Sequence, residues 1–325
     1  MQPGRRSFAF LLVLTLLTAC KSKPATTATN GLFPIVFQTD WYPQPEMGGF
    51  YQADLEGLYK AEGLDVKIVP GGPFIIGDQQ VATGAAQFAM GSSDAMLVRV
   101  SQGLPLVAVA ATMQQDPQAL MLHDESPVHT FEQLDGHTIA AKPGSIWFQY
   151  IVKRYNLTHV REIPATYSIA NFLQDPDYIQ QAFVTSEPFT AQQHGSKVRT
   201  MLISETGYQP YRVFFTSKQF LAEHPEIVAK FVKASIQGWK NYLADPTMVD
   251  AQLSKLNPNM NPEQMKFSID TLRQNHFIDG AGSPESHLGH FTAERWATTY
   301  KQLVDLKVTA APIDPASAYT LQFNP

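Results

Sequence analysis

The chain is predicted to fold as two α/β lobes joined by a two-strand hinge. Short apolar segments alternate with amphipathic segments, a pattern typical of strands and helices in a mainly parallel sheet. A length of 325 residues exceeds one comfortable hydrophobic core, so two units are expected. A late apolar segment, 211–216, leads back from the second unit to the first. The chain therefore crosses between the lobes twice, which is an arrangement suited to closing on a ligand.

The first lobe is predicted to comprise residues 31–115 together with 212–325. Its strands are expected at 35–39, 65–69, 87–90 and 106–111, and its first helices at 49–62 and 93–101. The turn at 70–73, with two prolines and two glycines, ends the second strand. Apolar side chains at helical spacing predict additional C-terminal helices at 225–244, 265–275 and 293–306.

The second lobe is predicted to comprise residues 116–211. Its strands are expected at 119–123, 138–141, 181–184 and 197–203, and its helices at 146–155 and 188–194. The strand at 211–216 then returns to the first lobe.

The N-terminus has the pattern of a secretory signal. Arg5 and Arg6 precede an apolar run at 8–17, and small residues lead to Cys20. This run is shorter than the ~20 apolar residues that span a bilayer. A cysteine just after the expected cut resembles the lipobox of bacterial lipoproteins, which implies a signal peptide at 1–19 and lipidation of Cys20. The alternative is an ordinary buried cysteine. Residues 20–30 would then form a flexible tether without bulky apolar side chains.

Composition excludes several classes of site. Cys20 is the only cysteine, so its lipidation leaves no thiol for a disulfide, a nucleophile or a metal. The nine histidines do not suggest a metal site, since the closest pair, His287 and His290, lies in a loop-like stretch. Cleavage before Cys20 removes two of 24 basic side chains and none of 29 acidic ones, giving −7. Such acidity argues against nucleic acid as a partner. No cofactor motif is present.

The loop after the first strand is the first candidate binding segment. Trp41, Tyr42 and Glu46 lie at the carboxyl end of that strand, where open α/β sheets bind ligands. Aromatic rings stack on a flat heterocycle, and a carboxylate accepts a hydrogen bond from a ring amino group. The alternative is a lid of surface aromatic side chains packed on the lobe.

The same loop opens a series of motifs with a family resemblance. The motifs are Asp40-Trp41-Tyr42-Pro43, Gly57-Leu58-Tyr59-Lys60, Phe88-Ala89-Met90-Gly91-Ser92-Ser93-Asp94-Ala95, Leu134-Asp135-Gly136 and Ser186-Glu187-Pro188. Together they resemble the periplasmic substrate-binding proteins of ABC transporters, in the group for thiamine precursors, nitrate, sulfonates and taurine. The resemblance covers roughly 35–245. It implies a type II periplasmic-binding-protein fold with the additional C-terminal helices noted above.

Further candidate ligand contacts follow from this resemblance. At the junction 91–94, Ser92, Ser93 or Asp94 would face the cleft, although Ser93 or Asp94 could simply cap the next helix.

Trp147, in the first turn after the 142–145 loop, could form a second stacking wall or a core contact. Backbone N–H groups at that helix start could hold an anion. Glu187 precedes a proline at a helix start and would lie on the cleft floor. Tyr167 precedes a stretch where members of the family also contribute contacts, which makes it a further candidate.

The resemblance implies a lipid-anchored monomer in the periplasm or at the cell surface. It would capture a small solute, an amino-pyrimidine thiamine precursor, and deliver it to an ABC permease. Riboflavin, nitrate, taurine and alkanesulfonates are alternative ligands. The family also contains a pyrimidine synthase that uses a histidine and a cysteine-rich motif. Here Met47 takes the place of that histidine and the cysteine motif is absent, so an enzyme is not expected. A sensory lipoprotein remains a third alternative.

Overall fold

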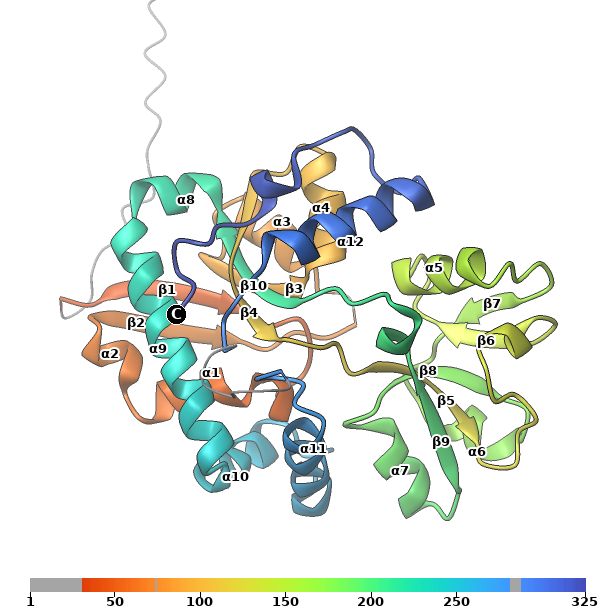
Figure 1. Ribbon diagram of the computed structural model, residues 1–325. Helices are drawn as coiled ribbons and strands as arrows, with labels where there is room; N and C mark the ends of the chain where they lie inside the picture. The colour runs from red at the N-terminus through yellow and green to blue at the C-terminus, as the bar shows by residue number, and fades with distance from the viewer. Residues whose placement is uncertain (1–30, 74, 281–287) are drawn as a thin grey trace, which may run out of the picture.

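Two five-stranded sheets, one in each lobe, form the framework of the protein (Figure 1). The computed structural model describes residues 31–73, 75–280 and 288–325. The predicted signal segment, Cys20, the tether up to residue 30 and His287 lie outside the described residues. No helix among the residues described is long and apolar enough to cross a membrane.

The sheet of lobe one has the order β2-β1-β3-β10-β4. Its strands are β1 (Phe33–Gln38), β2 (Leu64–Val69), β3 (Phe88–Ser92), β4 (Leu106–Met113) and β10 (Arg212–Ser217). Strand β1 pairs in parallel with β2 and β3, whereas β10 is antiparallel to both β3 and β4. Four of the five strands therefore run in the same direction, as predicted for a mainly parallel sheet, and β10 alone runs against them. The sheet is mixed because the strand that returns from lobe two enters it from the opposite end.

The sheet of lobe two repeats this arrangement, with the order β7-β6-β8-β5-β9. Its strands are β5 (Gln118–His123), β6 (Thr138–Ala141), β7 (Arg161–Pro164), β8 (Ile179–Phe183) and β9 (Val198–Leu202). Strand β6 is parallel to β7 and β8, and β5 is antiparallel to β8 and β9. The chain passes between the lobes in the segments that join β4 to β5 and β9 to β10.

Helices cover both sheets. Lobe one carries the short 3-10 helix η1 (Pro45–Met47), α1 (Gly48–Leu55), α2 (Leu58–Ala61), α3 (Gly77–Ala82) and α4 (Ser93–Ser101). Lobe two carries η2 (Glu132–Leu134), α5 (Ile146–Arg154), α6 (Ala170–Gln174), α7 (Glu187–Gln193) and η3 (Ile203–Thr206). The helix predicted at 49–62 is two helices, because Gly57 adopts the left-handed conformation (φ 71°) between them.

The C-terminal third is helical. It comprises α8 (Lys218–Glu223), α9 (Pro225–Ala244), α10 (Thr247–Leu256), α11 (Pro262–Gln274), α12 (Ala293–Leu306) and the 3-10 helix η5 (Pro315–Ala318). In Figure 1, α9 crosses lobe one beside α1, while α11 and α12 lie toward lobe two. Helix α11 contacts α7, and α12 contacts α5. The predicted two-lobed α/β architecture with additional C-terminal helices is confirmed.

Helices α1 and α9 cross at unusually close range. A Cβ atom built on Gly238 of α9 would lie 2.2 Å from the backbone oxygen of Gly49 in α1. A Cβ atom on Gly49 would lie 2.2 Å from the ring of Trp239. Only glycine therefore allows this crossing, which holds α1 against the core of lobe one. Because η1 leads directly into α1, the same crossing fixes the position of Glu46.

Candidate functional site

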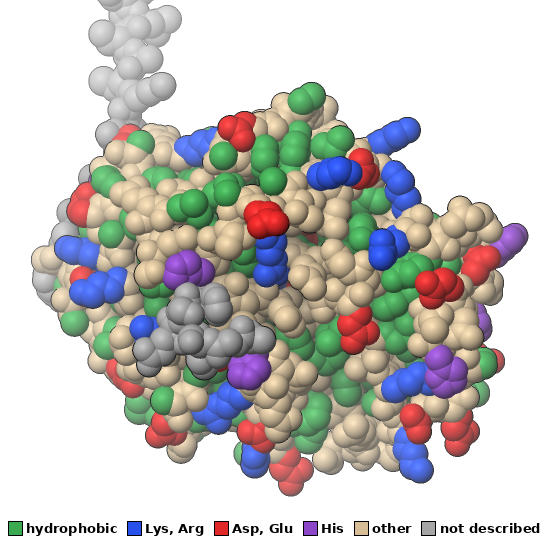
Figure 2. Space-filling model, in the orientation of Figure 1, with side chains coloured by type: hydrophobic (Ala, Val, Ile, Leu, Met, Phe, Trp, Pro, Cys, Tyr) green, Lys and Arg blue, Asp and Glu red, His purple; other side chains and the backbone are tan. Residues whose placement is uncertain are grey.

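A cleft between the lobes contains two adjoining cavities, of about 730 Å³ and 460 Å³. Strands, loops and helix starts of both lobes line each cavity. The residues common to both linings mark the boundary between the cavities and are Ser92, Ala95, Arg99, Gln118, Lys142, Gln181 and Arg212. On the face shown in Figure 2, the two lobes form one continuous surface with acidic and basic side chains interspersed. The structure thus describes lobes that touch each other and leave a partly open cleft between them.

An aromatic pair from opposite lobes lines the larger cavity. The ring of Trp41, in lobe one, lies 5.3 Å from the ring of Tyr167, in lobe two, at an angle of 53°. Tyr167 has a φ of 56°, an uncommon conformation for a bulky residue that is often found at functional sites. Tyr42 packs edge-on against Trp41 but is 48% exposed and lines neither cavity. Two of these three predicted aromatic residues therefore meet in the cleft.

Glu46 presents a buried carboxyl group to the larger cavity. Its side chain is only 2% exposed, and burial raises its pKa. The hydroxyl of Thr185 in lobe two donates a hydrogen bond to Oε1. No described residue donates to Oε2, which is also buried. A buried acceptor without a partner is costly, so this oxygen is available for a hydrogen bond with a ligand.

Glu187 lines the same cavity from lobe two. It begins α7, one residue before the helix start predicted at 188, and its Oε2 accepts a hydrogen bond from the backbone N–H of Phe183 at 2.8 Å. Burial raises its pKa to about 7, and the nearby charge of Glu46 adds to this effect. The cavity therefore contains two carboxyl groups that resist simultaneous ionisation.

The three residues Ser92, Ser93 and Asp94 lie in different environments. Ser92 lines both cavities, whereas Ser93 is buried and its hydroxyl accepts a hydrogen bond from the Tyr211 N–H at 2.9 Å. Asp94 lines the smaller cavity and accepts a hydrogen bond from the Tyr208 hydroxyl at 2.6 Å. The prediction that Ser93 or Asp94 caps α4 was wrong. Ser92 occupies the cap position without a side-chain hydrogen bond, while Asp94, inside the first turn, accepts a hydrogen bond from the Ala95 N–H at 2.8 Å.

Trp147 combines the two alternatives considered for it. It lines the smaller cavity, yet only 9% of it is exposed, and it belongs to the hydrophobic core of lobe two. Its ring packs perpendicular to Phe148, with 5.8 Å between the centroids. Met47 is buried and lines the larger cavity.

The sequence analysis missed Arg212, which lies where the two cavities join. Its guanidinium forms an ion pair with Asp40, lies 4.0 Å from Asp116, and sits 5.9 Å from the ring of Phe183. The Arg212 side chain is 15% exposed, and burial lowers its pKa to about 10. No described residue accepts a hydrogen bond from its Nε. An arginine directly before the apolar run 213–215 was the available signal.

Gln118 and Gln181, from adjacent strands of lobe two, also line both cavities and were missed. Gln181 accepts a hydrogen bond from the Lys142 N–H at 2.5 Å, and Gln118 donates to the Ala182 carbonyl at 3.1 Å. Within the described ranges, no group of three histidine, cysteine, aspartate or glutamate side chains could hold a metal ion.

The buried carboxyls predict a pH-dependent stability. The pKa of Asp116 is raised to about 7 by burial and by the charge of Asp94, and that of Glu187 to about 7 by burial. The folded protein therefore binds more protons than the unfolded chain between pH 4.5 and pH 7. Stability from these groups is present at pH 4 and is lost as the pH rises through 7.

We accordingly expect the melting temperature to fall by about 4 °C or more between pH 5 and pH 8. Differential scanning calorimetry of Glu187→Gln and Asp116→Asn should give a flatter dependence than the unsubstituted protein. An equal slope in the substituted and unsubstituted proteins would contradict the assignment.

Two α/β lobes around a ligand-sized cleft define the class of periplasmic binding proteins. The chain belongs to the NMT1/THI5-like family, whose model matches residues 44–248. The predicted resemblance is thereby confirmed.

Individual relatives span nearly the whole chain. The chain is 23% identical to the riboflavin-binding protein RibY of Chloroflexus aurantiacus, over 97% of this chain and 96% of that protein. It is 22% identical to the formylaminopyrimidine-binding protein of Halalkalibacterium halodurans, over 89% of each. Among solved structures, the periplasmic aliphatic sulphonate binding protein SsuA of Escherichia coli superposes with a TM-score of 0.66 at 15% identity. That match covers 87% of this chain and 91% of SsuA.

Proposed function

We propose that this protein is the substrate-binding component of an ABC importer and that it captures a planar nitrogen heterocycle, a thiamine pyrimidine precursor, between its lobes. One observation carries the proposal. An aromatic pair, Trp41 and Tyr167, and two carboxyl groups, Glu46 and Glu187, come from both lobes to the same cavity.

The chemistry of this cavity suits an amino-substituted ring. Indole and phenol faces pack against a flat ring, and the methionine-rich remainder of the lining adapts to its edges. Carboxylate oxygens accept hydrogen bonds from exocyclic amino groups, whereas a protonated carboxyl donates one to a ring nitrogen. The raised pKa values of Glu46 and Glu187 allow the pair to present one donor and one acceptor. Nitrate and unsubstituted alkanesulfonates have no N–H group that could donate a hydrogen bond to such a carboxylate.

Capture would proceed by closure of the lobes. Contacts made to the ligand by both lobes favour the closed state, which a permease in the inner membrane would recognise. A lipid on Cys20 would hold the monomer near that permease, in the periplasm or at the cell surface. Reversible capture of a solute by this component would need neither a cofactor nor a catalytic group. Met47 in place of a histidine and the single cysteine oppose the enzyme alternative.

The smaller cavity favours riboflavin as a second candidate. A lone pyrimidine would leave much of the combined space unfilled. A larger flat ring in the aromatic cavity could extend a hydroxylated chain past Arg212 toward Asp94 and Asp116. The polar groups of this second cavity match hydroxyl groups better than an apolar tail.

A thermal-shift and calorimetric screen tests the proposal. Formylaminopyrimidine or 4-amino-5-hydroxymethyl-2-methylpyrimidine, with riboflavin as the alternative, should raise the melting temperature. Trp41→Ala should weaken binding about 30-fold or more, as for a buried aromatic contact at the centre of an interface. Tyr42→Ala is the matched control, because the neighbouring ring lines neither cavity. Binding of nitrate, taurine or an alkanesulfonate in place of every heterocycle would overturn the ligand assignment.

A further inference from the structure

A chain of buried hydrogen bonds leads from a C-terminal helix into the cleft. The hydroxyl of Ser268, in α11, donates to the backbone oxygen of Thr185 at 2.6 Å. The Thr185 hydroxyl in turn donates to Oε1 of Glu46. The three residues are 1%, 0% and 2% exposed, respectively. Because Thr185 belongs to lobe two and the others to lobe one, the chain spans the boundary between the lobes twice.

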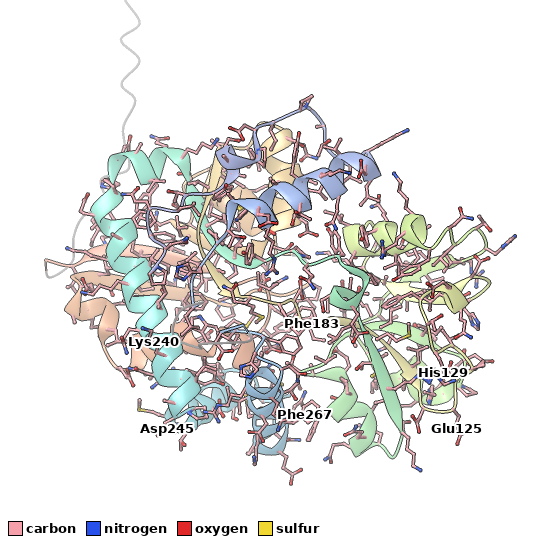
Figure 3. The ribbon with its side chains drawn as sticks, viewed as in Figure 1. Glu125, His129, Phe183, Lys240, Asp245 and Phe267 are labelled. Carbon is pink, nitrogen blue, oxygen red and sulfur yellow. The ribbon has the colours of Figure 1, made fainter. Side chains whose placement is uncertain are left out.

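Ser268 is not itself a cleft residue. None of the residues of α11 lines either cavity. A serine inside a helix usually points to solvent or bonds a carbonyl of its own helix. Ser268 instead satisfies a carbonyl of the other lobe. Next to it, Phe267 packs on Phe189 of α7 with 5.4 Å between the ring centroids, on the side of α11 that faces lobe two (Figure 3).

The segment that Ser268 holds also positions both cleft carboxyls. Residues 184–186 join β8 to α7 and are followed by Glu187. Val184 packs into the core cluster of lobe one, so this part of lobe two docks on lobe one when the lobes are together. A shift of the Thr185 peptide would remove the partner of Glu46 and move the start of α7. Two candidate ligand contacts therefore depend on one carbonyl.

We propose that Ser268 is a positioning residue. It acts through Thr185 to orient Glu46 and Glu187 and to hold the lobes in the closed arrangement. The ligand part of this inference rests on the proposed function, whereas the closure part does not.

Calorimetry with whichever probe binds the unsubstituted protein, formylaminopyrimidine or riboflavin, tests the effect of Ser268 on ligand affinity. Ser268→Ala leaves the Thr185 carbonyl buried without its donor and should weaken binding about tenfold. Ser268→Thr keeps the hydroxyl and should restore most of the affinity. The double variant Ser268→Ala/Thr185→Val should bind no more weakly than Thr185→Val alone, because both substitutions break the same chain.

Ser235→Ala is the matched control. Ser235 is a buried serine of α9 whose hydroxyl lies 3.0 Å from the Tyr59 hydroxyl, entirely within lobe one. Its removal should lower stability and leave affinity unchanged. Equal losses of affinity in Ser268→Ala and Ser235→Ala would show that Ser268 acts only as a buried core residue, and this result would overturn the inference.

The lobe arrangement can be measured without any ligand. Glu125 and Lys240 lie on different lobes (Figure 3). Spin labels are attached to cysteines introduced by Glu125→Cys and Lys240→Cys, in the full chain carrying Cys20→Ser. Electron-electron resonance should report longer distances after Ser268→Ala and unchanged distances after Ser235→Ala. If no heterocycle binds but the distances lengthen, the proposed ligand fails while the positioning role stands. Unchanged distances would contradict the closure part.

Discussion

Replacing Arg212 by leucine is expected to destabilise the protein by about 3–5 kcal/mol, because it leaves the Asp40 carboxylate without its ion-pair partner and removes the positive charge 4.0 Å from Asp116. These two side chains are 24% and 15% exposed, so water replaces the guanidinium only in part. The measurement is the free energy of unfolding from urea titration. Arg212→Lys retains the charge but not the planar fork of donors, and it should recover only part of the loss.

The matched control is Lys301→Met, which removes the exposed pair between Lys301 and Asp305 at 2.8 Å. Exposed ion pairs one helical turn apart contribute little to stability, so the free energy of unfolding should not change appreciably. The same loss after Lys301→Met and Arg212→Leu would mean that burial of the Arg212 pair has no special importance. Ligand affinity should fall in Arg212→Leu as well, since the side chain lies at the junction of the cavities.

Substituting Gly238 by alanine should cost about 3 kcal/mol or more, although alanine favours helices by about 1 kcal/mol over glycine. The added methyl group would meet the Gly49 oxygen at 2.2 Å and the Ala53 nitrogen at 2.9 Å. Both are backbone atoms that a side-chain rotation cannot move. Helix α1 must therefore shift away from α9, and η1 with Glu46 must follow.

Urea titration and ligand calorimetry together test this expectation. Gln237→Ala, at the exposed neighbouring position on α9, serves as the control and should change neither quantity appreciably. A Gly238→Ala protein with unchanged stability would show that the two helices can separate without cost. In that case the close crossing would not determine where Glu46 lies.

Elements with a strong, local pattern could be predicted from the sequence. The bounds expected for α4, β6, α9 and α12 agree with the structure, since apolar periodicity and terminal residues mark them clearly. Strand β7 was missed because Arg161–Pro164 is largely exposed at a sheet edge and has no apolar alternation. Helices α3 and α6 are short and have little periodic signal.

In the candidate site, too, residues in local motifs could be predicted from the sequence, and residues brought together by tertiary contacts could not. The opening motif and the Glu-Pro motif identified Trp41, Glu46 and Glu187, which the structure brings to one cavity. Tyr42 follows Trp41 in the chain, yet nothing local indicates that its ring turns outward. The environment of Arg212 could not be predicted, because Asp40 and Asp116 approach it only once both lobes and the returning strand are in place. Whether these residues bind the ligand stays a prediction.

The place of β10 has a consequence for the order of folding. It lies between β3 and β4, so those two strands have no direct pairing until residues 212–217 arrive. The other side of β4 is covered by the last residues of the chain, where the Thr320 N–H donates to the Ala108 oxygen at 3.0 Å. Lobe two is continuous and can acquire its sheet early, whereas lobe one must wait for the C-terminus. In a nascent chain of this protein, the sheet of lobe one thus stays incomplete until synthesis is nearly finished.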